Sequence, residues 1–295
     1  MAASSGSAWL QTDFGLYHAR YISRLPVPGL RKSSRIGPAS IAFDPDGKNP
    51  AFFTEYPGRI DMLALTFQHK RAHGSWFGEL TMRPHQPVQL PAGDVLPAFL
   101  NAAAASLLRA DADAVAPGAI YHAYDRYRTT QLQLGMQHDW HPLAGIALSG
   151  QAEVVAKHAA GLPDPALRRY GRADIFGNGP INGVCTVTSI DAARQCSLEG
   201  YATASALAYR LRLDARRALP AAALTVHGWA QLTHDARGWS YDSQINEGRN
   251  NASLGVRLEY RQRYSAELVF APVWGGAYNA QADRDQVSFA LGMRY

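Results

Sequence analysis

Alternation of apolar and polar residues, the period of a strand with two different faces, recurs along this chain. The pattern is clearest over residues 287–295, where Val287, Phe289, Leu291, Met293 and Tyr295 alternate with small or charged residues. A second clear case is 252–260, where alanine, leucine, valine and tyrosine alternate with serine, glycine, arginine and glutamate. A chain built from such segments is expected to form antiparallel sheets.

Ten segments carry this alternation, and the connections between them follow a regular order. They are long (25–59), short (69–74), long (85–125), short (139–143), long (159–198), short (214–221), intermediate (236–249), short (261–263) and intermediate (277–285). Outer-membrane β-barrels show this asymmetry, with short periplasmic turns and longer extracellular loops. The order predicts hairpins whose tight turns all lie at one end.

The alternating segments lie in a chain with no unbroken apolar stretch near the 18 or so residues of a membrane helix. Charged residues make up 18% of the sequence, below the roughly 25% of soluble domains. A membrane-spanning protein without such helices must be a closed barrel. The prediction is a single all-β unit over 1–295, an antiparallel transmembrane β-barrel of about ten strands. It has long extracellular loops and a short helix over 99–108.

The inward faces of the predicted strands carry charged residues, which would avoid the cost of about 2–4 kcal/mol for Arg or Lys at the lipid midplane. These candidates for lining the lumen are Glu79, Arg83, Glu153, Lys157, Arg210, Arg212, Arg257, Glu259 and Glu267. The set is typical of a polar, filled barrel interior. It is also compatible with a charged passage that selects a solute.

Cys185 and Cys196 are the two cysteines, eleven positions apart in a loop-like stretch. A disulfide between them would indicate an oxidising compartment and stabilise the loop by roughly 3 kcal/mol. Two unpaired thiols are the alternative. The closing residues Phe289, Leu291, Met293 and Tyr295 resemble the assembly signal of bacterial outer-membrane barrels.

The sequence contains no nucleotide-binding glycine loop, no nucleophile elbow and no paired metal-binding cysteines. We therefore expect no enzyme, metal or cofactor, and the scattered basic residues argue against nucleic acid. A hydrolase at the barrel rim is retained as an alternative, built on His234 and Asp235 with Asp283 and Asp285.

Five stretches resemble a known bacterial family in collinear order. They are FFTEYPGRI (52–60), RPHQPVQLPAGD (83–94), HDARGWS (234–240), EGR (247–249) and GGAYNAQADRD (275–285). The family is the Gram-negative outer-membrane group labelled domain of unknown function 1302. Gly58 and Arg59 depart from the acidic pair that its members carry there. The resemblance covers nearly the whole chain and corresponds to the C-terminal half of family members.

The resemblance implies an outer-membrane, porin-like barrel concerned with passage of small hydrophobic molecules. The expected partners are outer-membrane lipid, the barrel assembly machinery and hydrophobic small molecules. A structural or partner-docking barrel with a blocked lumen is the alternative. Residues 1–15 contain no secretory signal peptide, so we expect the chain to be the C-terminal portion of a longer barrel protein.

Overall fold

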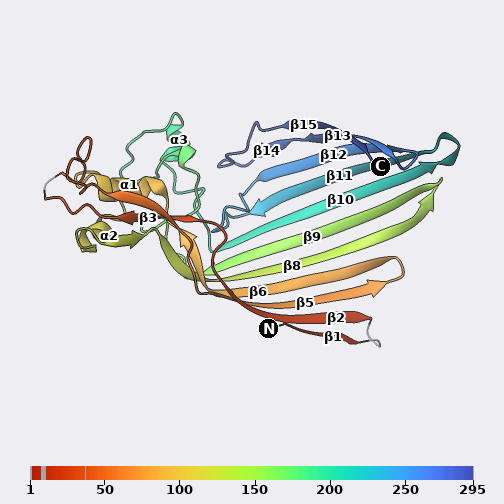
Figure 1. Cartoon of the computed structure of the whole chain (residues 1–295), viewed down its shortest axis with the longest axis horizontal. Helices are drawn as coiled ribbons and strands as arrows, with labels where there is room; N and C mark the ends of the chain where they lie inside the picture. Colours follow the sequence, from red (N-terminus) through yellow and green to blue (C-terminus); the bar gives the residue numbers. More distant parts are fainter. Residues whose placement is uncertain (1, 8–10, 37, 295) are drawn as a thin grey trace.

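The computed structural model describes residues 2–7, 11–36 and 38–294, and its main feature is a twisted antiparallel sheet of 12 strands (Figure 1). In spatial order its strands are β1 (Ala2–Ser7), β2 (Thr12–Tyr21), β5 (Ile60–Arg71), β6 (Gly74–Gln89), β8 (Tyr124–Leu143), β9 (Ile146–Ala160), β10 (Ser205–Leu219), β11 (Leu224–Arg237), β12 (Arg249–Tyr260), β13 (Tyr264–Ala271) and β15 (Gln286–Met293), with β14 (Val273–Gly275) also beside β12. The ten strands expected from alternation are all present, in chain order. Strand β1 was not expected, because its small residues do not alternate.

The connections separate into two groups at opposite ends of the sheet (Figure 1). One end holds the tight turns, and we call it the turn end. There β8 and β9 are longer than expected, so their turn is Ala144–Gly145 rather than 139–143. Both turn residues have positive φ, 51° and 78°, as a two-residue hairpin with right-handed twist requires.

The long connections form a folded layer at the other end, which we call the cap: residues 22–36, 38–59, 90–123, 161–204, 238–248 and 276–285. The cap contains a small sheet with the order β4 (Ala51–Glu55), β3 (Val27–Arg31), β7 (Ile120–His122). Its helices are α1 (Ala92–Leu100), α2 (Arg109–Ala114), α3 (Ala192–Gln195) and the 3-10 turn η1 (Asp174–Phe176), whereas the 3-10 turn η2 (Pro220–Ala222) lies at the turn end.

The helix predicted over 99–108 is wrong in position. Helix α1 ends at Leu100, and Asn101 is extended with φ −139° and ψ 105°. Arg109 at the start of α2 then donates hydrogen bonds to the carbonyls of Pro97, Ala98, Asn101 and Ala104. These bonds stabilise a turn where alanine propensity alone predicted a continuous helix.

The long sheet has two different faces. Its apolar face exposes large side chains, including Leu134, Leu211 (47% exposed), Leu254 and Phe289 (66% exposed). The register aligns them in rows, and one row joins Leu213, Ala230, Leu254, Phe270 and Val287 across five strands. The residues between them form the opposite face, which we call the polar face.

The described strands do not close into a barrel. The sheet runs from β1 to β15, and within residues 2–7, 11–36 and 38–294 no pairing joins these two strands. What the structure supports is therefore an all-β protein with antiparallel sheets. In the described part of the chain, no helix has the length and apolar character needed to cross a membrane.

Candidate functional site

The polar face carries all nine charged residues that the sequence assigned to inward positions. Several lie directly opposite each other in the register, such as Glu153 opposite Arg210 and Arg257 opposite Glu267. Arg210 Nη2 lies 2.7 Å from Glu153 Oε1, and Arg257 Nη1 lies 3.9 Å from Glu267 Oε2. The first of these is a direct cross-strand ion pair, so charges on the polar face partly neutralise one another.

Other polar-face charges have partners along or beside their own strands. Arg212 bonds Asp214 with both Nε and Nη2, at 2.7 and 2.8 Å, and Arg257 lies 3.3 Å from Glu259. Glu79 accepts a hydrogen bond from Thr81 at 2.5 Å, and Arg83 donates to the Tyr21 hydroxyl at 3.1 Å. The polar face is thus an ordered hydrogen-bonded network.

The cap covers one end of the polar face. Lys157, one of the candidates for lining the lumen, has a side chain that is only 4% exposed beneath cap residues 238–248. Its ammonium donates to Asp242 Oδ2 and Gln244 Oε1, each at 2.5 Å. Ala206 and Ala208, also on the polar face, pack against Ile245 of the same loop. The cap therefore closes over the sheet at this end.

The cap is organised around a buried ion pair between Asp94 of α1 and Arg169. Arg169 Nε and Nη2 each lie 2.6 Å from a different carboxylate oxygen of Asp94. The Asp94 side chain is 3% exposed and the Arg169 side chain 0%. Arg169 also donates to the carbonyl of Pro180. The pair lies next to an apolar core that includes Leu90, Val95 and Phe99. A bidentate pair in such a setting orders two segments 75 residues apart.

Arg168 and Tyr170 extend this network toward the sheet. Arg168 bonds both Asp111 of α2, at 2.8 Å, and Asp125 of β8, at 2.6 Å. The Tyr170 hydroxyl donates to Asp125 at 2.7 Å and lies 2.7 Å from the Tyr127 hydroxyl. Burial, together with these bonds to Tyr127 and Asp125, raises the pKa of Tyr170 above its ordinary value of 10.0.

This shift predicts loss of cap stability at alkaline pH. The folded pKa of Tyr170 is raised, so its contribution is complete below pH 10 and is lost as pH rises toward the folded value. We expect near-ultraviolet circular dichroism of the cap to weaken above pH 10, and Tyr170→Phe to be less sensitive. The absorbance at 295 nm measures the ionisation of tyrosine. If every tyrosine were ionised at pH 10 while the cap remained intact, the prediction would be contradicted.

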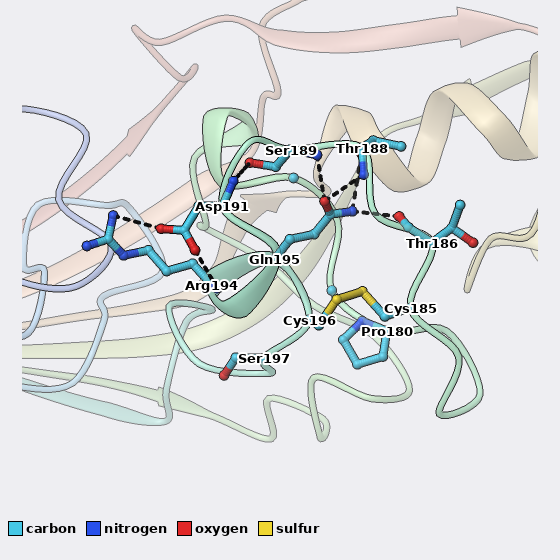
Figure 2. Close-up of a disulfide and its surroundings, with 12 residues drawn as sticks. Pro180, Cys185, Thr186, Thr188, Ser189, Asp191, Arg194, Gln195, Cys196 and Ser197 are labelled. Carbon is cyan, nitrogen blue, oxygen red and sulfur yellow. Dashed lines mark hydrogen bonds and ion pairs between the residues drawn. A yellow bond between two sulfur atoms is a disulfide. The ribbon is translucent and has the colours of Figure 1, made fainter.

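The structure joins Cys185 and Cys196 in a disulfide within the cap loop between β9 and β10. Figure 2 shows the neighbouring Gln195, whose carboxamide accepts from the backbone N–H groups of Thr188 and Ser189 and donates to the carbonyl of Thr186. Arg172 anchors the same loop by donating to carbonyls that include those of Gly177 and Ser197, at 2.7 and 2.9 Å. The loop is thus held by covalent and polar contacts.

Removing the disulfide is expected to loosen this loop. The double variant Cys185→Ser, Cys196→Ser should lose about 3 kcal/mol of loop stability, because the unfolded chain regains closure entropy. Limited proteolysis should then cleave within residues 177–200, where the oxidised protein resists. If the variant resisted proteolysis as well as the oxidised protein does, the contacts of Gln195 and Arg172 would be sufficient to hold the loop.

A cavity of about 610 Å³ lies within the cap, lined by segments 23–27, 86–92, 171–174, 241–249 and 278–281. Its apolar walls include Leu25, Leu90 and Tyr278, and its polar walls include Arg172 and Asp242. Further hollows lie on the polar face beyond the cap, one around Glu79 and Gln133. The volume of the cap cavity lies within the range of about 300–1,000 Å³ that is typical of small-molecule sites. The cavity could not be predicted from the sequence, because most of its walls come from loops without alternation.

The rim residues considered for hydrolysis do not assemble. His234 Nδ1 lies 2.8 Å from Asn250 Oδ1, whereas Asp235 is buried against Arg249 at 2.7 Å. Asp285 accepts a bond from the backbone of Val273. No hydrogen bond or ion pair joins His234 to Asp283 or Asp285 among the described residues.

Two other points of the sequence concern metal ligands and the closing residues of the chain. In the described part of the chain, no group of three or more His, Cys, Asp or Glu side chains is arranged to hold a metal. Of the closing residues that resemble an assembly signal, Phe289, Leu291 and Met293 lie exposed on the apolar face. Tyr295 is outside the described residues.

These features define an antiparallel all-β protein with a two-faced sheet and a folded cap at one end. Over residues 2–295 the chain matches the model of a family described as a protein of unknown function (DUF1302), and it belongs to that family. No curated protein matches the chain significantly. The five stretches that carried the resemblance all lie in the cap or at the strand ends that enter it.

Proposed function

We propose that the chain forms the wall of an outer-membrane β-barrel through which small hydrophobic molecules pass. The observation that carries this proposal is the two-faced sheet, with leucine, valine, phenylalanine and tyrosine exposed on one side and paired charges on the other. A water-soluble protein has no reason to expose such a continuous apolar surface. Lipid is the solvent that suits it.

The size of the apolar face supports a membrane setting. On β10 it extends from Leu207 to Ala215, eight residue steps, and ends at Ser205 and Arg217. Eight steps cover about 26 Å along a strand, which at a tilt of about 40° spans about 20 Å, most of the apolar band of about 25 Å in outer-membrane barrels. Within the proposal, 1–295 is a single unit inserted by the barrel assembly machinery.

The cap cavity is the proposed entrance. Its mixed lining would accept a molecule with an apolar body, and it lies where the cap closes over the polar face. The alternative is a structural barrel with a blocked lumen. The closure of Lys157 by Asp242 and the pairing of Arg210 with Glu153 favour that alternative, since both reduce open polar space. Neither role includes a catalytic step.

Flux through proteoliposomes separates the two roles. We expect the full chain to admit a small hydrophobic fluorophore, and Ala280→Trp, which fills the cavity, to lower the rate several-fold. Ala282→Trp is the matched control, because Ala282 is exposed and outside the cavity lining. Absence of both solute flux and single-channel conductance would reject passage and leave the blocked barrel. Equal flux in both variants would reject the cavity as the entrance.

A further inference from the structure

The turn end of the sheet carries seven of the 29 Lys and Arg residues of the protein. Its segments 69–75, 140–148, 215–226, 260–264 and 293–294 contain no Asp or Glu. Their cations are Lys70, Arg71, Arg216, Arg217, Arg261, Arg263 and Arg294. Removing these seven from the total of 29 leaves 22 Lys and Arg against 24 Asp and Glu. The net charge of +5 therefore comes entirely from the turn end.

These cations are available to a partner. All seven are exposed, and among the described residues only Arg216 has a carboxylate neighbour, Glu259 at 3.9 Å. Arg261 lies 5.1 Å from the ring of Tyr260, and Arg263 lies 5.6 Å from that of Tyr264. Stacking on these rings places both guanidinium groups beside the apolar face.

An apolar groove of about 470 Å³ lies on the apolar face, between the middle of the apolar band and the turn end. Its walls include Met136, Trp140, Leu211, Leu213, Ala230 and Leu254. Trp140 pairs with Leu148, which pairs with Ala215, and Arg217 follows two residues later on β10. The row of paired residues that begins at Trp140 therefore borders the groove, and Arg217 lies just beyond this row. The ring of Trp140 lies over Gly150, where a Cβ atom would meet it at 2.5 Å.

We propose that the turn end binds anionic glycerophospholipids, with an acyl chain in this groove and the headgroup phosphate at Arg217. The proposal rests on the membrane placement proposed above. Charge complementarity selects the ligand, because a phosphodiester offers the negative charge that these turn segments lack. The cations lie directly beside apolar surface. A lipid can contact both the cations and the apolar surface, whereas a soluble anion contacts the cations alone.

Quenching of Trp140 fluorescence tests the proposal. The full chain in non-ionic detergent micelles is titrated with phosphatidylglycerol carrying brominated acyl chains, and separately with brominated phosphatidylcholine. The Trp140→Phe variant identifies the Trp140 signal. We expect phosphatidylglycerol to quench at lower mole fractions and this preference to weaken with added salt. Arg217→Gln should reduce the preference about fivefold.

The matched control is Arg237→Gln, which removes an equally exposed arginine at the cap end of the neighbouring strand β11. It should leave the preference unchanged. Equal quenching by both lipids, or equal effects of the two substitutions, would overturn the lipid selectivity and leave the membrane placement standing. No quenching by either lipid would instead reject the membrane placement itself.

Discussion

Asp94→Ala is expected to destabilise the cap by about 3–5 kcal/mol, because it leaves the Arg169 guanidinium buried without its counter-charge. The loss should appear as protease cleavage in the cap and loss of near-ultraviolet circular dichroism. The strand signal in the far ultraviolet should persist, since the ion pair orders loops rather than the long sheet.

Two further variants identify the cause. The double replacement Asp94→Leu, Arg169→Met removes both charges, so it should recover most of the lost stability. Asp61→Asn breaks the exposed pair with Arg20, at 2.7 Å, and should change stability little because solvent screens that pair. If Asp94→Ala were as mild as Asp61→Asn, the buried pair would not organise the cap.

The second large effect is expected from arginine placed on the apolar face. Leu134→Arg should lower the stability of the membrane-inserted protein by about 2–4 kcal/mol, because it places a charge near the lipid midplane. Gln133→Arg introduces the same side chain one residue earlier, on the polar face opposite Glu79. That variant should be close to neutral. Urea unfolding from lipid vesicles measures both.

The comparison is informative because the two variants share a strand, a depth and a new charge. If Gln133→Arg were the more disruptive, the lipid-facing and inward assignments would be reversed. If both were neutral, neither face of β8 would contact lipid.

The strands were predictable because alternation is a local signal. In β12 each of Ala252, Leu254, Val256, Leu258 and Tyr260 faces the apolar side as its spacing indicates. Strand ends were less predictable. Asp139 and Trp140 belong to β8, because the strand continues past the apolar band to the Ala144–Gly145 turn.

The cap was not predictable, because it depends on contacts between residues far apart in sequence. Asp94 was singled out only through a family motif, and nothing local indicates that Arg169, 75 residues later, is its partner. The run Arg168, Arg169, Tyr170 is the one signal that could have been followed, since adjacent arginines in a loop require acidic or aromatic partners. Lys157 has the alternation of an inward residue, yet only the fold shows that Asp242 covers it.

Whether one face of the long sheet lies in lipid can be measured by an accessibility scan along β10 in lipid vesicles. Spin labels are attached to single cysteines at 209–213 in a background without Cys185 and Cys196, and their exposure to oxygen and to a water-soluble nickel chelate is compared. We predict that oxygen contact is highest at Tyr209, Leu211 and Leu213 and lowest at Arg210 and Arg212. Equal contact with the nickel chelate at all five positions would contradict a sheet with one face in lipid.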